Sequence, residues 1–295
     1  MDQASKLRSA ILKKNKYNYV SEGNIDSNEN PRVICISSGK GGVGKTNFTL
    51  NLALSLRQKG NRVLVIDADL GLANIEILLG IDIKYGFIDL VEDNVKIEDI
   101  MVEGPLGIKI ISGGAGINEV ADLPLYKINK ILNNMIYLKQ YVDFILIDTG
   151  AGISKSVMSF VLAAQEVIVV TTPEPTSIAD AYALIKVITK KTNEKIINMV
   201  INRVDNKKEA DTTFKKMEMV SKRFLNKPIS YLGYISDDKN VRSSVKKQVP
   251  FMLNSPNCLA SKDVENICDS LLGNTENKNK FNNFINRLSN LFLGG

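Results

Sequence analysis

The sequence contains no histidine, and its 295 residues include only three cysteines. Without histidine, Ser-His-Asp and Cys-His catalysis are excluded, as are zinc sites that use imidazole ligands. Cys35, Cys258 and Cys268 form no C-x-x-C pair, so neither a disulfide framework nor a cysteine-bound iron–sulfur cluster is expected. A reducing cytoplasm is the compartment that fits this cysteine usage.

Long apolar runs are also missing. No run approaches the roughly 18 residues of a membrane-spanning helix, and residues 1–15 lack the apolar stretch of about 7–15 residues that marks a secretory signal. Hydrophobic residues make up 44% of the chain and charged residues 24%, which is ordinary for a soluble globular protein. The length suits one large domain or two small ones.

Positive charge is concentrated in one part of the chain. The net charge is +6, and residues 186–247 hold 16 Lys and Arg against 7 Asp and Glu, so the remainder is slightly acidic. A basic region can face an anionic partner, such as a membrane or nucleic acid, or form a solvated lysine-rich surface. The composition leaves both interpretations open.

Short apolar runs alternate with helical patterns along most of the chain. Expected strands lie at 33–37, 62–67, 108–112, 143–148, 166–172, 195–202 and 228–235. Expected helices lie at 47–59, 126–139, 177–190, 208–224 and 257–272. This alternation predicts an α/β fold, with a mainly parallel twisted sheet flanked by helices on both faces.

Polar segments divide the chain into four parts. Residues 1–31 are predicted to hold a short helix and a flexible linker, residues 32–272 the folded core, and residues 273–280 a second linker. Residues 281–295 are patterned again and are predicted to form an amphipathic helix.

The strongest motif is SSGKGGVGKT, residues 37–46, which fits the P-loop pattern G-x-x-x-x-G-K-[ST]. Its glycines let backbone N–H groups approach phosphate oxygens, and the helix that follows adds a favourable dipole. In such a loop Lys45 reaches the β- and γ-phosphates, and the Thr46 hydroxyl binds Mg²⁺. The predicted nucleotide-binding residues of the loop are Gly39, Lys40, Gly41, Gly42, Val43, Gly44, Lys45, Thr46 and Asn47.

A second lysine inside the loop narrows the family. KGGVGKT, residues 40–46, resembles the deviant Walker A motif of the MinD/ParA-like ATPases, which are P-loop NTPases of the SIMIBI type. The resemblance implies ATP and Mg²⁺ as cofactors and an ATP-sandwiched homodimer in which Lys40 reaches the nucleotide of the partner subunit. A cation supplied across an interface stabilises transition-state charge. The alternative is a lysine that binds the phosphates of its own subunit.

Acidic residues follow two of the expected strands, at the edge where open α/β sheets bind ligands. Asp67 and Asp148 are predicted to hold Mg²⁺ together with Thr46. The resemblance implies that Asp69 orients and deprotonates the attacking water and that the Gly152 N–H senses the γ-phosphate. The alternative for each aspartate is a cap or turn residue.

Asn202, at the end of the strand 195–202, resembles the asparagine with which the family reads adenine. Its amide offers a donor and an acceptor to the base edge, and the N-K-x-D signature of guanine recognition is missing. ATP is therefore favoured over GTP. Residues 171–177 and 235–238 end other strands and are expected to line the nucleotide or the dimer surface, with Glu174 near the interface.

The N-terminus and two core segments narrow the resemblance to one branch of the family. DQASKLR, residues 2–8, resembles the element that opens members of the FlhG family of flagellar regulators, and residues 144–152 and 171–186 are more similar to FlhG than to MinD. In FlhG this element binds and stimulates FlhF, a signal-recognition-type GTPase. The predicted partner-binding residues are Asp2, Gln3, Ala4, Leu7 and Arg8.

The C-terminal segment resembles the membrane-targeting helix of MinD and FlhG. Its apolar residues share one helical face: Phe281, Phe284, Ile285, Leu288, Leu291 and Phe292. Burying six such side chains gives roughly 9–18 kcal/mol, but ordering about 13 residues at about 1–2 kcal/mol each offsets most of it. One such helix should bind an anionic membrane only marginally, and the two helices of a dimer should bind it far more strongly. The alternatives are a helix packed on its own core or in a partner groove.

The motifs together predict an ATP-dependent, dimerising, membrane-associating ATPase with slow turnover. The resemblance implies that it regulates flagellar number and placement, with FlhF and flagellar C-ring proteins as partners, and that it is cytoplasmic and reversibly peripheral to the cell membrane. The alternatives are a ParA-type partition ATPase that binds DNA, which the two terminal segments disfavour, and a MinD-type regulator of the division site.

Overall fold

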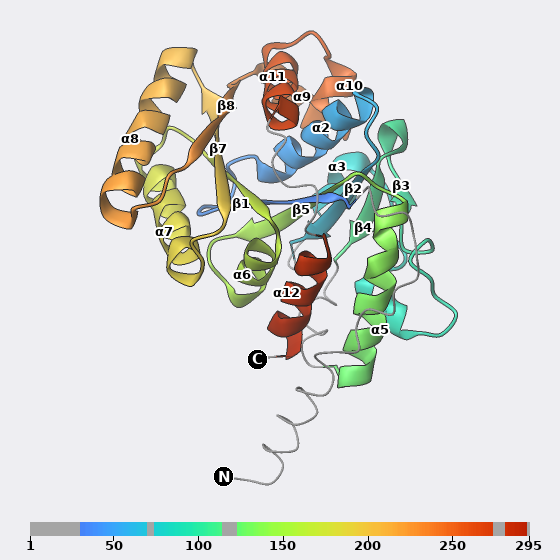
Figure 1. The fold of residues 1–295 in the computed structure, drawn as a ribbon. Coiled ribbons are helices and arrows are strands. Elements are labelled where there is room, and N and C mark those ends of the chain that lie inside the picture. The colour runs from blue at the N-terminus through green and yellow to red at the C-terminus, as the bar shows by residue number, and fades with distance from the viewer. Residues whose placement is uncertain (1–29, 70–73, 114–122, 274–280, 294–295) are drawn as a thin grey trace, which may run out of the picture.

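The computed structural model describes residues 30–69, 74–113, 123–273 and 281–293, which form an eight-stranded sheet covered by helices on both faces (Figure 1). The spatial order of the strands is β3-β4-β2-β5-β1-β6-β7-β8. All neighbouring strands pair in parallel except β3, which is antiparallel to β4. The strands are β1 (Arg32–Ser38), β2 (Val63–Ala68), β3 (Val102–Glu103), β4 (Lys109–Ser112), β5 (Phe144–Ala151), β6 (Glu166–Thr171), β7 (Ile196–Val204) and β8 (Ser230–Ser236).

The central strands are apolar on both sides because both faces of the sheet are covered. In β1, Val33 and Cys35 point into one buried cluster, whereas Ile34 and Ile36 point into the other. Alternate side chains of a strand face opposite sides of a sheet, so one continuous apolar run supplies two cores.

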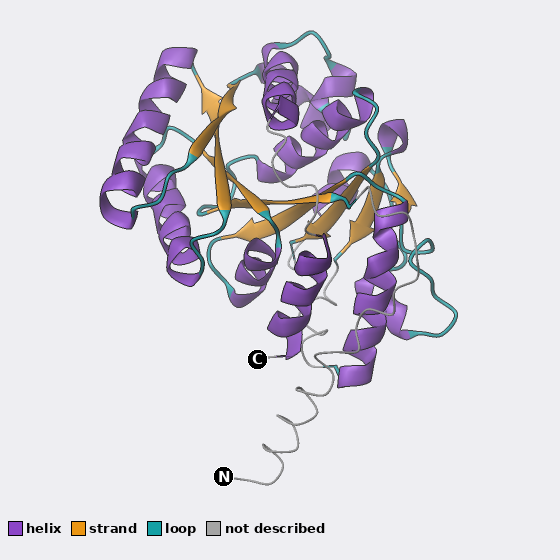
Figure 2. Cartoon of the chain, in the orientation of Figure 1, coloured by secondary structure: helices purple, strands orange, loops and turns teal. Residues whose placement is uncertain are grey.

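Helices from distant parts of the chain cover each face (Figure 2). One face packs against α2 (Lys45–Gln58), α3 (Asn74–Leu79), α9 (Lys239–Lys246), α10 (Phe251–Asn254) and α11 (Leu259–Gly273). The other packs against α5 (Leu125–Ile136), α6 (Lys155–Ala163), α7 (Pro175–Lys191), α8 (Lys207–Leu225) and α12 (Phe281–Leu293). Short 3-10 turns lie at η1 (Phe87–Val91), η2 (Pro105–Gly107) and η3 (Tyr137–Gln140).

The predicted C-terminal helix forms, and it is docked on the core rather than separate from it. Phe281, Phe284, Ile285 and Leu288 are buried in the same cluster as the sheet, and the Phe281 and Phe284 rings stack with centroids 6.1 Å apart. Helix α12 lies between α5 and α6, as Figure 1 also shows. The described residues of the segment 281–295 therefore pack into the same hydrophobic core as residues 32–272.

All seven expected strands and all five expected core helices are confirmed, with ends shifted by a few residues. The sequence analysis missed β3, α3, α6, α9 and α10. Helices α3 and α10 span six and four residues, too few to show a helical period. Helix α6 is predominantly apolar, and five of its nine residues are buried, so its sequence shows no clear alternation of polar and apolar faces. None of the described helices is long and apolar enough to cross a lipid bilayer.

Candidate functional site

The P-loop leaves the carboxyl end of β1, where the strand order turns from β5 and β2 on one side to β6 and β7 on the other. Open α/β sheets bind their ligands at such a point. Gly42 and Gly44 have φ values of +77° and +89°, in the left-handed region that favours glycine. These two positions give the loop the curvature with which backbone N–H groups surround a phosphate.

Two adjoining cavities lie at this edge of the sheet. The first has a volume of about 330 Å³ and is lined by the loop from Gly41 to Asn47, by Asp69 and by α3. The second has a volume of about 370 Å³ and is lined by Asn202, by residues 235–238 and by α9. Gly44, Asn47 and Arg203 line both cavities. A ligand with an anionic part and a flat apolar part therefore fits one continuous site.

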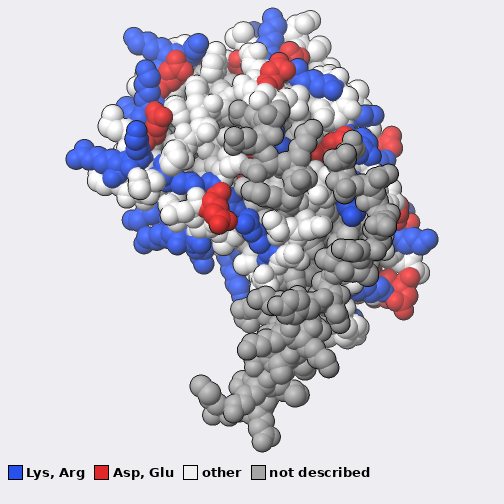
Figure 3. All heavy atoms as spheres, viewed as in Figure 1, with Lys and Arg blue, Asp and Glu red and all other residues white. Residues whose placement is uncertain are grey.

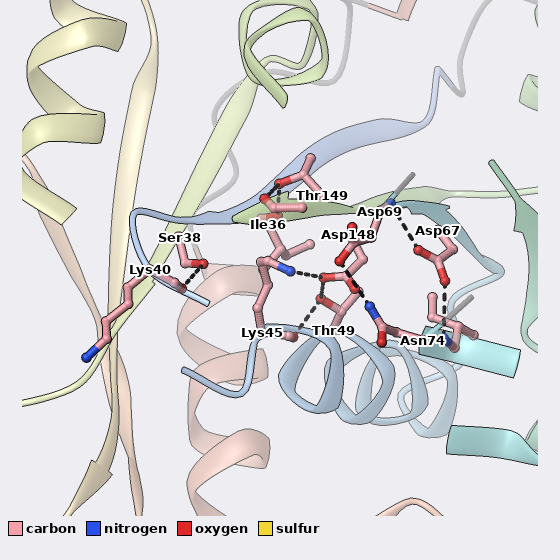
Figure 4. Close-up of polar contacts among 12 residues, drawn as sticks. Ile36, Ser38, Lys40, Lys45, Thr49, Asp67, Asp69, Asn74, Asp148 and Thr149 are labelled. Atoms are coloured by element: carbon pink, nitrogen blue, oxygen red, sulfur yellow. Dashed lines mark hydrogen bonds and ion pairs between the residues drawn. The ribbon is translucent and has the colours of Figure 1, made fainter. Parts of the chain in front are cut away.

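Lys45 points under the loop toward the end of β5 (Figure 4). Its Nζ lies 3.5 Å from Oδ1 of Asp148, which also accepts a hydrogen bond of 3.1 Å from the Thr49 hydroxyl. Burial raises the pKa of Asp148, while Lys45 and the Thr46 hydroxyl favour its charged form. The second carboxylate oxygen, Oδ2, is buried and has no hydrogen-bond partner.

The orphaned Oδ2 of Asp148 and the neighbouring Thr46 hydroxyl fit a hydrated Mg²⁺. A buried carboxylate oxygen without a donor is costly, and a cation with its water ligands would satisfy it. The donor set of carboxylates and a hydroxyl is all oxygen, as Mg²⁺ prefers. Among the described residues, no group of three or more His, Cys, Asp or Glu is placed so that it could hold a metal ion.

Asp67 lies near the carboxyl end of β2, and Asp69 directly follows that strand. Asp67 accepts hydrogen bonds from the backbone N–H groups of Asp69 (3.1 Å) and Ile75 (3.1 Å). Burial raises the pKa of Asp67 to about 7, and the nearby Asp148 carboxylate adds to the rise. Asp69 lines the first cavity and accepts a hydrogen bond of 3.0 Å from Asn74 (Figure 4). These two hydrogen bonds hold the backbone of Asp69, whose side chain lines the first cavity, and of Ile75 in α3 beside the end of β2.

Asn202 links the P-loop to the second cavity. Its Nδ2 donates to the Val43 carbonyl at 2.7 Å, and its Oδ1 accepts from the Arg203 N–H at 2.9 Å. A Cβ atom at Gly44 would lie only 2.4 Å from Nδ2, so this loop position must be glycine for Asn202 to reach it. One amide hydrogen and one lone pair of Asn202 stay available to a base.

The side chain of Lys40 points away from Lys45 and Asp148 (Figure 4). Its Nζ donates to Oε2 of Glu174 and to the Thr176 hydroxyl, each at 3.0 Å. The Lys40 side chain is 40% exposed and that of Glu174 59%, and neither residue lines the first cavity. In this chain Lys40 therefore does not approach its own phosphate site.

Two glycines predicted to contact the nucleotide also have contacts within the protein. A Cβ atom at Gly39 would lie 2.1 Å from the backbone of Asp180, so Gly39 allows the loop to pack against α7. The Gly152 N–H donates to the Ser38 carbonyl at 2.8 Å, and Ala151 rather than Gly152 lines the cavity. Contact between Gly152 and a γ-phosphate would require that hydrogen bond to break.

Sequence analysis missed Arg203, Asn74 and Ile77, which also line the first cavity. Arg203 has a φ of +56°, a rare conformation for a residue with a side chain, and it borders both cavities. Its position directly after Asn202 was the available signal. Asn74 and Ile77 belong to the short helix α3, which had no recognisable pattern.

The structure describes most of the C-terminal segment but not the N-terminal one. The residues Asp2, Gln3, Ala4, Leu7 and Arg8 lie outside the described part of the chain, as does the side chain of Phe292. The other apolar residues assigned to a membrane are turned inward: four are buried, and Leu291 packs on the same cluster. Arg287, on the polar side of α12, lies 3.5 Å from Glu194.

Comparison with known proteins agrees with this geometry. A family model described as ParA, NUBPL iron-transfer P-loop NTPase, matches residues 29–272. Antiactivator FleN of Pseudomonas aeruginosa is 40% identical over 217 residues, covering 74% of this chain and 78% of FleN. Flagellum site-determining protein YlxH of Helicobacter pylori is 32% identical over 285 residues, covering 93% of this chain and 92% of YlxH.

Solved structures show the same architecture. Septum site-determining protein MinD from Pyrococcus horikoshii OT3, in complex with Mg-ADP, has a TM-score of 0.65 and 25% identity, over 84% of this chain and 100% of that chain. Of the three cysteines, Cys35 and Cys268 are buried and Cys258 is partly exposed.

Proposed function

The chain belongs to the MinD/ParA family of P-loop NTPases, and we propose that within this family it is an ATP-dependent switch that regulates the number and placement of flagella. The observation that carries the proposal is Lys40, held outside its own phosphate cavity at the surface next to α7. A lysine in that position can act on a second subunit. The flagellar role rests on the similarity to FleN and YlxH.

ATP is the proposed nucleotide, and its γ-phosphate is hydrolysed by water. Lys45 and the N–H groups of the loop bind the phosphates, while Thr46, Asp148 and Asp67 hold Mg²⁺, whose charge offsets that of the phosphate oxygens. Asp69 orients the attacking water from the side of the first cavity. Asn202 and the second cavity receive the adenine.

Hydrolysis is proposed to need a homodimer. Lys45 and Arg203 are the cations on the lining of the first cavity, whereas Lys40 lies outside it and is bound to Glu174. Facing a second copy of the chain, Lys40 can leave this exposed ion pair at little cost, because such pairs contribute about 0–1 kcal/mol. It then stabilises transition-state charge in the partner subunit, which makes turnover slow and dependent on dimerisation.

The membrane is the proposed destination of α12. Phe281, Phe284, Ile285 and Leu288 leave water whether they are docked on the core or inserted into lipid, so hydrophobic burial favours both locations to a similar extent. Helix α6, on which α12 packs, follows β5, and Ala151 at the end of β5 lines the phosphate cavity. This connection supports a coupling between nucleotide state and α12 release. Two released helices in one dimer bind far better than one.

The remaining partners follow from the family resemblance. We assign Asp2, Gln3, Ala4, Leu7 and Arg8 to the FlhF GTPase, and the surface of the core to flagellar C-ring proteins. In the cell the chain would be cytoplasmic and reversibly peripheral to the membrane.

One observation favours a second candidate, a partition ATPase that binds DNA. Lys and Arg side chains gather over the side of the molecule formed by α7 and α8 (Figure 3). Exposed cations on α8 include Lys207, Lys208, Lys215, Lys216 and Lys222. A nucleic acid bound there would dissociate steeply with salt.

Flotation of the full chain with anionic vesicles tests both candidates. An Asp69→Ala variant, expected to retain ATP in a stable dimer, should float with Mg·ATP and sediment with Mg·ADP. Leu288→Asp should abolish flotation, because it charges the apolar face of α12. Asn290→Asp adds the same charge to the exposed face and is the matched control. The partition ATPase would be favoured if flotation changes neither with ATP nor in Leu288→Asp while binding to duplex DNA depends on ATP.

A further inference from the structure

Another cavity opens at the opposite edge of the sheet from the P-loop. It has a volume of about 610 Å³ and lies at the amino ends of β6, β7 and β8. The ATP site lies at the carboxyl end of β1, which is parallel to β6. The two sites are therefore separated by the length of the strands. The charged and polar side chains that line this cavity are those of Arg32, Glu166, Glu194, Lys195, Asn198, Lys227 and Ser230.

Arg32 and Glu166 neutralise each other inside the cavity. The guanidinium of Arg32 donates to both carboxylate oxygens of Glu166, at 2.5 Å and 2.8 Å, and to the Leu271 carbonyl at 2.8 Å. Paired forks of this kind are strong and fix both side chains. This pair leaves no net charge.

Lys195 and Lys227 have no such counterpart. Both are buried, with exposed fractions of 3% and 8%. Lys195 donates to the carbonyls of Leu162 (2.8 Å) and Ala164, and Lys227 to that of Asn193 (2.6 Å). An ammonium group has three N–H bonds, so one donor of Lys195 and two of Lys227 are unused among the described contacts.

The surrounding charges do not compensate these ammonium groups. Burial lowers the pKa of Lys195 to about 8, and the charge of Arg287 lowers it as well, whereas Cys35 and Glu194 raise it. Burial also lowers the pKa of Lys227. Glu194 itself is largely exposed and lies beside Arg287 of α12. Buried cations are costly unless an anion accompanies them.

We propose that this cavity binds a phosphate group between the ammonium groups of Lys195 and Lys227. The two lysines carry two positive charges and three unused donors, which match the charge of about −1.5 to −2 and the three oxygens of a phosphate monoester near pH 7. Lysine is a common phosphate ligand because its ammonium acts as a compact charge. Ser230, exposed at the mouth of the cavity, offers a further hydroxyl donor.

The phosphate has two possible sources, a soluble ester and a lipid headgroup. Glu194 joins the cavity to α12 through Arg287, so an anion bound here lies beside the helix proposed to enter the membrane. The nucleotide is not a candidate occupant, because its own site lies at the other edge of the sheet. Failure of this proposal would leave the proposed ATPase function intact.

Equilibrium dialysis of the full chain with labelled inorganic phosphate tests the site. Saturation with Mg·ADP first fills the P-loop. We expect one further phosphate per chain, bound at least tenfold more weakly by Lys227→Gln and by Ser230→Asp. Ser230 is exposed and without a packing role, so this variant should fold. Lys186→Gln, an exposed lysine on α7, should bind as the native chain does. No further phosphate, or equal binding by both variants, would overturn the proposal.

Vesicles distinguish the two sources. Full chains are floated with vesicles of phosphatidylcholine and phosphatidic acid, because the headgroup of phosphatidic acid is a phosphate monoester. If Lys227→Gln and Ser230→Asp reduce flotation while Lys186→Gln does not, the site binds lipid headgroups. If flotation is unchanged and dialysis still separates the variants, the site binds a soluble phosphate ester.

Discussion

The Nζ atom of Lys40 lies 3.0 Å from Oε2 of Glu174, across 134 positions of sequence. Glu174 directly precedes α7, and Thr176 in the first turn of that helix completes the contact. The loop thus carries two lysines with opposite directions: Lys45 is turned inward to Asp148, and Lys40 outward to α7. Their replacement should have separable effects.

Replacing the outward lysine should affect hydrolysis but not binding. Lys40→Met should bind Mg·ATP within about twofold of the native affinity, because Lys40 does not line the cavity. Hydrolysis should fall about 10³-fold or more, the usual effect of losing a cation supplied across an interface. Fluorescent-nucleotide titration and phosphate release measure the two quantities. Lys45→Met, which should lose binding itself, is the comparison, and loss of binding by Lys40→Met would place Lys40 in its own site.

Asn202 should contribute more to the binding of ATP than to the binding of a triphosphate that lacks a base. Asn202→Ala removes the hydrogen bond to Val43 as well as any contact with adenine. A base-reading role predicts about a tenfold loss for ATP, or about 1.4 kcal/mol, and a clearly smaller loss for inorganic tripolyphosphate. Calorimetric titration with both ligands measures the difference. Equal losses would mean that Asn202 only supports the loop.

Helix α12 should contribute to the stability of the monomer. Phe284 is fully buried between α12 and the core, so Phe284→Ala should lower the free energy of unfolding by about 3–5 kcal/mol. Asn286→Ala, on the exposed side of the same helix, should change it by less than about 0.5 kcal/mol. Urea denaturation without nucleotide measures both. If the two variants are equally stable, α12 is not docked in solution.

Stability should rise with pH in the range where Lys195 loses its proton. Its pKa is about 8 in the folded chain against 10.5 for an ordinary lysine, so between these values the unfolded chain holds more protons. The free energy of unfolding then increases with pH across this window, by on the order of 1–3 kcal/mol. Below pH 8 the cost of burying the charged Lys195 side chain is fully present. Urea denaturation from pH 7 to 10.5 gives the free energy of unfolding of the native and Lys195→Met chains. The difference between the two chains should become smaller as the pH rises. Lys186→Met should run parallel to the native chain instead.

Local patterns predicted much of the fold. The strand from Val33 to Ser37, the P-loop after it and the apolar face of residues 281–292 all depend on neighbours within a few positions, whose order the chain itself sets. Elements shorter than two helical turns, such as α3, gave no period and were missed. That omission also hid Asn74 and Ile77 from the predicted site.

The sequence by itself determined a parallel α/β sheet, a P-loop with a second lysine, and an amphipathic C-terminus, because each depends on short-range spacing and side-chain type. Only the tertiary structure decided that Lys40 contacts Glu174, that Asn202 braces the carbonyl of Val43, and that α12 is docked between α5 and α6. Each of these contacts joins residues more than a hundred positions apart. The order of the strands brings them together, and side-chain packing then selects one partner among several that the sequence alone would allow.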